Sequence, residues 1–249
     1  MAVNEGLPAS GVALVIGAGD GNGAAIARRF ARGGYTVCVV RRDAEKLQPL
    51  VAQITAEGGR AFAYATDATV EAEVATLVEQ VEREHGGIEV LVFNVGVNRP
   101  QSILDETADG YRKLWELGCL AGFLAGREVA GRMVARGHGT ILFTGATASL
   151  RGAARFAAFA GAKHGLRALA QSMARELGPR GIHVAHVVID GLIDTVAVKT
   201  VFPAYYAQCE KQGRLIAPEH VAENYWALHI QPRDTWSFEL DLRPAVEPW

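Results

Sequence analysis

One stretch of this sequence decides its fold: Val12-Ala13-Leu14-Val15-Ile16-Gly17-Ala18-Gly19-Asp20-Gly21-Asn22-Gly23. The apolar run at its start is typical of a central parallel strand, because helices cover both faces of such a strand. The glycines allow a tight turn, and good helix formers follow at 24–31. A strand, a glycine turn and a helix in this order predict a dinucleotide-binding unit, and a merely flexible turn is the plainer alternative.

The same alternation continues along the chain. Short β-rich runs predict strands at 12–16, 36–40, 61–66, 90–93, 140–144, 183–189 and 237–242. Helical spacing lies between them, at 24–31, 44–56, 70–83, 111–136 and 154–177. With right-handed crossovers, these elements predict an α/β fold: a doubly wound parallel sheet (Rossmann fold) of about seven strands with helices on both faces. No repeat or linker divides residues 1–249, so we expect a single dinucleotide-binding domain.

Composition favours a protein that acts on small molecules. The 249 residues are 49% hydrophobic and carry a formal net charge of −2, which provides no positive field for nucleic acid or an anionic membrane. Three scattered cysteines do not make a disulfide framework, and the histidines lack metal-ligand spacing; His183 and His186 would face opposite sides of a strand. The N-terminal residues 1–11 lack a basic region followed by an apolar core. We expect a cytoplasmic protein without a metal.

The glycine turn and the end of the second strand indicate the cofactor. Free N–H groups at a helix start attract a pyrophosphate, so we assign cofactor contacts to Gly17, Gly19, Asp20, Gly21, Asn22 and Gly23. At about 20 residues further on, an NAD-selective chain carries an acid for the ribose hydroxyls, but here Arg41-Arg42 stands there. Guanidinium groups suit a 2′-phosphate, which favours NADP over NAD, with Arg42 as the preferred ligand. Two solvated arginines are the plainer alternative.

These motifs resemble those of the short-chain dehydrogenase/reductase family over essentially the whole chain. The family pattern Thr-Gly-x-x-x-Gly-x-Gly matches at Gly17, Gly21 and Gly23, with Ile16 in place of the threonine. Further matches are the acid after the third strand, the Asn-containing element after the fourth, and the Gly-x-x-x-Thr element after the sixth. The resemblance implies that these elements supply additional cofactor contacts: Asp67, Ala68, Asn94, Val95, Gly96, Ile193 and Thr195.

The catalytic positions depart from the family pattern. Relatives carry Tyr-x-x-x-Lys on the long fifth helix, whereas this chain has Phe159-Ala160-Gly161-Ala162-Lys163. The family serine falls on Ala146, and the helix-four asparagine falls on Cys119. The resemblance therefore implies that Lys163 is the one retained catalytic residue, with a role in holding the cofactor. The pattern is similar to a subgroup of the family in which Phe replaces the tyrosine beside a retained lysine.

Two hypotheses about function follow. Losing a general acid removes a factor of about 10² to 10⁴ in rate, and losing an oxyanion donor about 10² to 10³, so ordinary ketone reduction should be poor. One hypothesis is an oxidoreductase that reduces an activated C=C bond or another substrate needing no tyrosine. Its candidate proton donors are Tyr205, Tyr206, His164, Asp190, Asp194 and Thr147. The alternative is a catalytically silent, cofactor-binding sensor or scaffold.

Two further expectations concern helices. The polar and aromatic segment 196–213 is expected to be either a helix-containing substrate lid over the ligand crevice or a plain surface helix. The segments 111–136 and 154–177 are rich in Ala, Gly and Leu, which permits close packing between subunits. Relatives commonly pair through these helices, so a homodimer or homotetramer is expected. The small residues could instead seat the helices on their own sheet.

Overall fold

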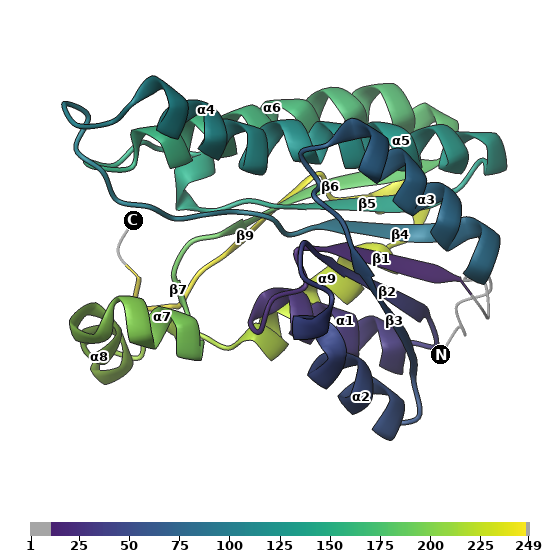
Figure 1. The fold of residues 1–249 in the computed structure, drawn as a ribbon, viewed down its shortest axis with the longest axis horizontal. Coiled ribbons are helices and arrows are strands. Elements are labelled where there is room, and N and C mark those ends of the chain that lie inside the picture. The colour runs from purple at the N-terminus through teal and green to yellow at the C-terminus, as the bar shows by residue number, and fades with distance from the viewer. Residues whose placement is uncertain (1–10, 248–249) are drawn as a thin grey trace.

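The central sheet is parallel throughout, in the strand order β3-β2-β1-β4-β5-β6-β9 (Figure 1). The computed structural model describes residues 11–247, so the first ten and last two residues of the expected domain 1–249 lie outside the described residues. The strands are β1 (Val12–Ile16), β2 (Thr36–Arg41), β3 (Arg60–Ala65), β4 (Ile88–Phe93), β5 (Gly139–Thr144), β6 (Ile182–Ile189) and β9 (Glu239–Leu242). All seven predicted strands are confirmed. The strand order reverses between β1 and β4, and a crevice for ligands lies at such a switch point.

Helices cover both faces of the sheet (Figure 1). One layer contains α3 (Glu71–His85), α4 (Ala108–Trp115), α5 (Ala121–Arg136) and α6 (Ala157–Leu177). The other contains α1 (Asn22–Arg32), α2 (Gln48–Ala56) and α9 (Pro218–His229). Side chains alternate along a strand, so Leu14 packs into the first layer and Val15 into the second. The predicted doubly wound fold is therefore confirmed, and its crevice lies at the carboxyl ends of the strands.

The predicted helix 111–136 is confirmed, but it is not regular along its whole length. A π-helical turn, Glu116–Leu120, joins α4 to α5. This turn lies close to α6, because a Cβ atom on Gly118 would lie 3.0 Å from the Cβ atom of Ala162. A π turn adds one residue to a helix without ending its apolar spacing, so the sequence pattern does not reveal it.

Helix α9 is absent from the sequence prediction. Val221, Tyr225 and Leu228 are nevertheless spaced for one helical face, and all three are buried. The hydroxyls of Tyr225 and Thr144 are 2.6 Å apart, which joins this helix to β5.

The segment 196–213 contains two short helices, α7 (Val196–Val201) and α8 (Pro203–Lys211). The short strands β7 (Leu192–Ile193) and β8 (Leu215–Ile216) pair at the base of this segment. In Figure 1 the two helices project beyond the end of the sheet, below α4. The segment is therefore helical, as both of its predicted forms require, and its role as a substrate lid stays a prediction. None of the helices within 11–247 is both long and apolar enough to cross a membrane.

Candidate cofactor and active site

The glycine turn after β1 is held against the end of β4. Gly17 has φ +88°, and a Cβ atom there would lie 2.7 Å from the carbonyl oxygen of Asn94. The Asn94 side chain donates a hydrogen bond of 3.0 Å to the carbonyl oxygen of Gly17. A Cβ atom on Gly23 would lie 2.4 Å from that same carbonyl oxygen. Because neighbouring backbone atoms come this close, a side chain would not fit at position 17 or position 23.

The start of α1 has the properties of an anion site. No side chain caps this helix, and its first turn carries no acidic residue. A Cβ atom on Gly19 would meet open space, and one on Gly21 would lie 2.8 Å from the methyl carbon of Thr195. Asn22 is buried, and its Oδ1 has no partner within the described part of the chain. Free N–H groups and the positive end of the helix dipole fit a pyrophosphate.

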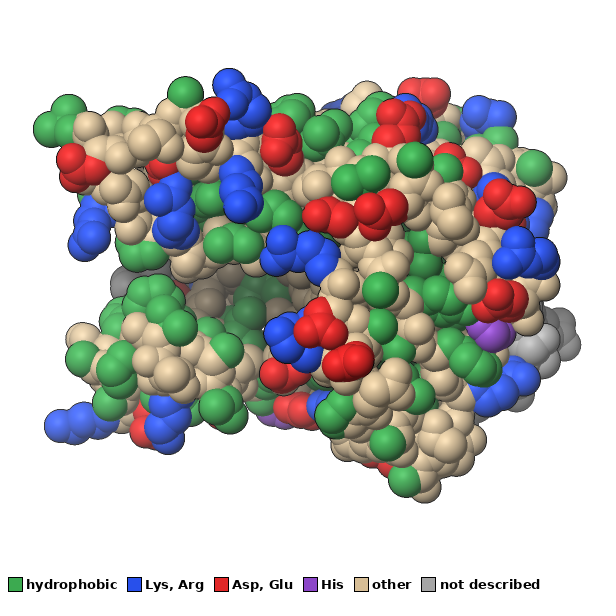
Figure 2. All heavy atoms as spheres, in the orientation of Figure 1, with side chains coloured by type: hydrophobic (Ala, Val, Ile, Leu, Met, Phe, Trp, Pro, Cys, Tyr) green, Lys and Arg blue, Asp and Glu red, His purple; other side chains and the backbone are tan. Residues whose placement is uncertain are grey.

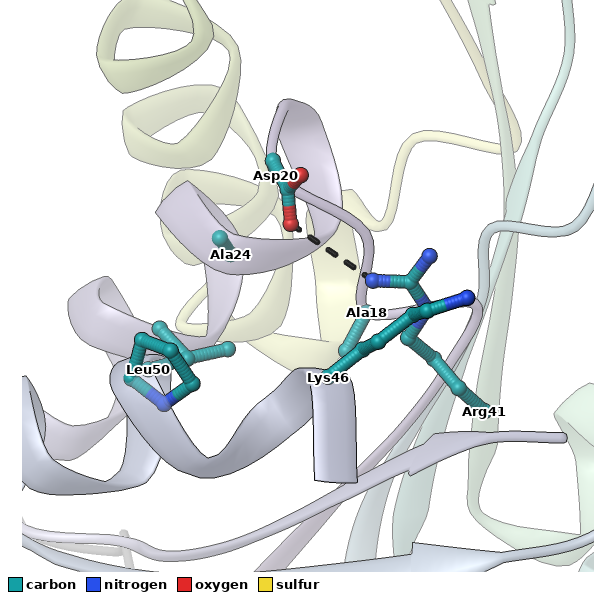
Figure 3. A pocket seen from close by; sticks show the side chains of 7 residues that line it. Ala18, Asp20, Ala24, Arg41, Lys46 and Leu50 are labelled. Atoms are coloured by element: carbon teal, nitrogen blue, oxygen red, sulfur yellow. Dashed lines mark ion pairs between the residues drawn. The ribbon is translucent and has the colours of Figure 1, made fainter. Parts of the chain in front are cut away.

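A cavity of about 420 Å³ lies beside this turn (Figure 3). Arg41 at the end of β2 and Lys46 in the following 3₁₀ turn both line it, and the Arg41 guanidinium lies 3.5 Å from the exposed carboxylate of Asp20 (Figure 3). The other lining residues are Ala18, Ala24, Pro49 and Leu50. Arg42 is not among the residues that line the cavity. Its charge instead contributes to the lowered pKa of Asp67.

Asp67 closes the turn after β3. Its carboxylate accepts hydrogen bonds from the backbone N–H of Thr69 at 3.0 Å and from the Thr69 hydroxyl at 2.7 Å. These bonds lower the pKa of Asp67 most strongly, and the charge of Arg42 adds to the effect. Asp67 therefore stays ionised at the same edge of the sheet as the glycine turn, with Ala68 buried behind it.

Lys163 joins the ends of two strands beneath this crevice. Its side chain is 4% exposed, and Nζ donates to the carbonyl oxygen of Thr144 at 2.7 Å and to that of Val95 at 3.2 Å. Burial lowers the pKa of Lys163 to about 8. A Cβ atom on Gly96 would lie 3.2 Å from Nζ and 3.9 Å from the ring of Phe159. The loop after β4, the lysine and the phenylalanine therefore meet at one place.

Cys119 and Ala146 occupy the positions of the family's asparagine and serine. Cys119 is buried in the π-helical turn, where burial raises the pKa of its thiol and the charge of Lys163 opposes that shift. Ala146 follows β5 and is half-buried, and its backbone N–H donates to the hydroxyl of Ser149 at 3.2 Å. A thiol and a methyl group thus stand at these two positions.

Four of the candidate proton donors form two pairs. The Thr147 hydroxyl donates to Asp190, which is 3% exposed and also accepts from Arg243 at 2.5 Å. The Tyr206 hydroxyl donates to Asp194 at 2.5 Å, and this bond raises the pKa of Tyr206 to about 12. The first pair adjoins Ala146, and the second joins α8 to the turn after β7.

The remaining two candidate donors are exposed. His164 is on α6, where its Nδ1 lies 2.9 Å from the carbonyl oxygen of Ala160. Tyr205 is 47% exposed on α8. Residues 11–247 contain no group of three or more His, Cys, Asp or Glu side chains that could hold a metal ion.

Residues 11–205 match the family model described as short chain dehydrogenase. The chain belongs to this family. The cis-4-hydroxycyclohexanecarboxylate dehydrogenase of Sinomonas cyclohexanicum is 33% identical to this short-chain dehydrogenase over 240 residues, covering 95% of this chain and 94% of the relative. A crystal structure of a short-chain dehydrogenase from Rhodopseudomonas palustris is 48% identical, with a TM-score of 0.81, and the match covers 96% of this chain and 100% of that chain. A metagenomic short-chain oxidoreductase in complex with NADP is 28% identical, with a TM-score of 0.81 and coverage of 95% and 98%.

Sequence reasoning missed one basic side chain at the candidate cofactor site of this short-chain dehydrogenase. Lys46 shares the cavity with Arg41, although it lies five residues further along the chain. The sequence did contain a signal for it, because Lys46 is a further basic residue shortly after the end of β2. The predicted cofactor residues of the glycine turn, the loop after β4 and the turn before α7 all lie at the carboxyl edge of the sheet, where Thr195 contacts the glycine turn.

Proposed function

We propose that this short-chain dehydrogenase binds NADP(H) in preference to NAD(H), and that Arg41 and Lys46 hold the 2′-phosphate. The observation that carries the proposal is the cavity that both cations line beside the glycine turn. A guanidinium can bind a phosphate through two hydrogen bonds, and an ammonium adds a compact positive charge. Arg42 is then a secondary residue, because it interacts with Asp67. The exposed Asp20 would turn toward solvent when the phosphate binds.

The same proposal assigns cofactor contacts around the crevice. The glycine turn holds the pyrophosphate, and Asp67 and Ala68 flank the adenine. Asn94, Val95 and Gly96 line the central part, and Ile193 and Thr195 hold the nicotinamide end. Lys163 has three N–H donors, and two of them bind Thr144 and Val95, which leaves one for a ribose hydroxyl.

We further propose that the active site is atypical. When bound, NADPH supplies a hydride at this edge of the sheet. The half-buried Phe159 ring beside Lys163 offers no proton, and Ala146 offers no hydrogen bond to a substrate oxygen. The site therefore suits an activated C=C bond, or another substrate that needs no tyrosine. This arrangement supports membership of the subgroup with Phe in the tyrosine position.

A two-step experiment tests this function. First, the dissociation constants of NADPH and NADH are measured by fluorescence titration, and NADPH should bind more tightly. Second, NADPH consumption is followed with matched ketones, imines and enoyl compounds, and the enoyl compounds should be reduced fastest. Faster ketone reduction would contradict the atypical chemistry. NADPH binding without turnover of any compound would instead favour the sensor or scaffold alternative.

We also propose that the chain forms a homodimer or homotetramer through α4 and α6. A second cavity, of about 500 Å³, lies on their outer surface and is lined by Ala108, Tyr111, Arg112, Trp115 and Gly161. Tyr111 and Trp115 are both exposed in the single chain. Tyr and Trp side chains are enriched at the centres of protein interfaces. The described cysteines are all free and buried, which fits the cytoplasmic location that we propose.

A further inference from the structure

Apolar side chains gather around one hollow of the surface. Figure 2 shows the surface hollowed between the α4 end of the molecule and the helices α7 and α8, with apolar side chains on both sides. Within residues 11–247, thirteen large apolar side chains are exposed, and seven of them belong to the loops and the two helices that follow β4, β5 and β7 at the carboxyl edge of the sheet. We name these seven the apolar rim: Val97, Ile103, Leu104, Leu150, Val196, Val201 and Tyr205. Soluble proteins rarely expose so many apolar groups together without a ligand or partner for them.

Chain connections place the rim at the mouth of the candidate active site. The segments 97–107, 150–156 and 196–211 follow β4, β5 and β6, so all begin at the carboxyl edge of the sheet. The backbone N–H of Gln101 donates to the carbonyl oxygen of Arg155 at 2.8 Å, which joins the first two segments. The third begins beside Thr195, whose methyl group lies against the glycine turn.

The rim is continuous with an apolar floor. Val97 follows Gly96 directly, and Gly96 lies against both Lys163 and the Phe159 ring. Ala146 adds a half-buried methyl group to this floor. An apolar surface therefore extends from the reacting end of the crevice to its mouth.

Several polar groups near the rim already have partners within the chain. Thr147 is bound to Asp190, and Tyr206 is bound to Asp194. The guanidinium of Arg99 donates to both carboxylate oxygens of one glutamate, at 2.6 and 2.7 Å. A substrate hydroxyl facing one of these paired groups would lose its hydrogen bond to water without regaining one, at a cost of about 1–3 kcal/mol for each unpaired group.

We infer that the substrate carries a large apolar body, an alkyl chain or a hydrocarbon ring, which the apolar rim holds while the reacting atoms lie beside Phe159. The choice of a small molecule over a second protein follows from the shape, because the elements that carry the rim lie on both sides of a hollow (Figures 1 and 2). The inference rests on the proposed function only for the reaction and not for binding.

A homologous series tests the inference. Straight-chain 3-alken-2-ones of increasing length are titrated calorimetrically into the protein with saturating NADP⁺, which cannot donate a hydride, so binding is observed without turnover. Each added CH₂ should tighten binding about fourfold, which corresponds to about 0.8 kcal/mol, until the rim is covered. A dissociation constant that does not change with chain length would overturn the inference, as would tighter binding of a ketose of similar length.

Matched variants assign the effect to the rim. Val196→Ser and Ile103→Ser should each weaken binding of the longest ketone about fivefold or more and leave the shortest nearly unchanged. Phe62→Ser is the control, because Phe62 is an exposed apolar residue in the middle of β3, outside the segments that carry the rim. Equal weakening by all three variants would contradict a role for the rim.

Two further measurements separate this inference from its alternatives. NADPH affinity is measured for each variant, and the rim variants should retain it. If the protein binds the long ketone with the expected length dependence but binds no NADPH, the proposed function fails and the inference stands. If Val196→Ser abolishes self-association or sedimentation with anionic lipid vesicles while ketone binding is independent of length, the rim serves a protein or a membrane and the inference fails.

Discussion

The ε-ammonium group of Lys163 lies 6.0 Å from the centroid of the Phe159 ring, which precedes it by one turn on α6. The electron-rich face of a ring at this distance attracts a cation, which partly offsets the cost of burying the charge of Lys163. The ring itself has no proton to give. The lysine is therefore suited to binding, whereas the neighbouring position is suited only to packing.

Removing the Arg41 side chain should weaken the binding of NADPH but not that of NADH. Hydrogen bonds to a charged group are worth about 1.5–3 kcal/mol, so Arg41→Ala should raise the dissociation constant of NADPH by about 10- to 150-fold. NADH affinity should change little, because NADH lacks the 2′-phosphate. Fluorescence titration measures both constants, with Arg175→Ala as a surface control for the lost charge. A larger loss in Arg42→Ala than in Arg41→Ala would restore Arg42 as the main ligand.

Burial of Lys163 should make the cofactor-free protein more stable as the pH rises above 8. The folded pKa of about 8 lies below the ordinary value of 10.5, so the unfolded chain binds more protons between these values. Over this window the free energy of unfolding should rise by up to about 1.4 kcal/mol per pH unit from this residue. Urea denaturation from pH 7.5 to 9.5 should show a shallower slope for Lys163→Met. The same slope in both proteins would contradict the buried charge.

Two buried histidines should make the protein sensitive to acid. Burial lowers the pKa of His186 and His229 to about 4, from an ordinary value of 6.5. Their contribution to the free energy of unfolding is intact above pH 6.5. It is lost as the pH falls toward 4, because these histidines bind protons in the unfolded chain at a higher pH than in the folded one. Between pH 6.5 and 5, each should reduce the free energy of unfolding by about 2 kcal/mol.

Denaturation at pH 6.5 and 5 of His186→Asn checks this acid sensitivity. The variant should lose about 2 kcal/mol less than the unaltered protein over this interval. His164→Asn is the control, since His164 is exposed and should leave the loss unchanged. An unchanged loss in the His186 variant would show that this residue is protonated in the folded state.

Self-association should depend on Trp115, which lines the outer cavity of α4 and α6. Aromatic side chains at interface centres often contribute 2 kcal/mol or more, so Trp115→Ser should weaken association by about 30-fold or more. Light scattering across micromolar concentrations measures the change, with Phe62→Ser, an exposed aromatic position on β3, as the control. A monomeric unaltered protein at these concentrations would reject the proposed assembly.

The sequence predicted the sheet well because its signal is local. Buried parallel strands need apolar runs such as that ending at Ile16, and glycines must follow where the backbone passes close to Asn94. The π-helical turn was not predictable from its own segment; it lies where Gly118 packs closely against α6. Long-range packing of this kind has no signature in a single segment.

The side chains at the phosphate cavity were harder to predict. Adjacent residues of a strand point to opposite sides, so the sequence could not decide whether Arg41 or Arg42 faces the crevice. Lys46 lines the cavity from the 3₁₀ turn that follows β2, in which the next residue, Leu47, is buried. The choice between two neighbouring arginines therefore needed the three-dimensional arrangement.

The most direct test of the atypical active site is kcat/KM for NADPH-dependent reduction of a small activated ketone. We expect poor activity from the unaltered protein and only a weak gain from Phe159→Tyr, because the substrate oxygen would still lack the hydrogen bond that a serine provides. Adding Ala146→Ser and Cys119→Asn should raise kcat/KM more than additively, since residues of one catalytic unit are coupled. If the unaltered protein reduces the ketone as fast as the triple variant, another group supplies the proton and the account is wrong.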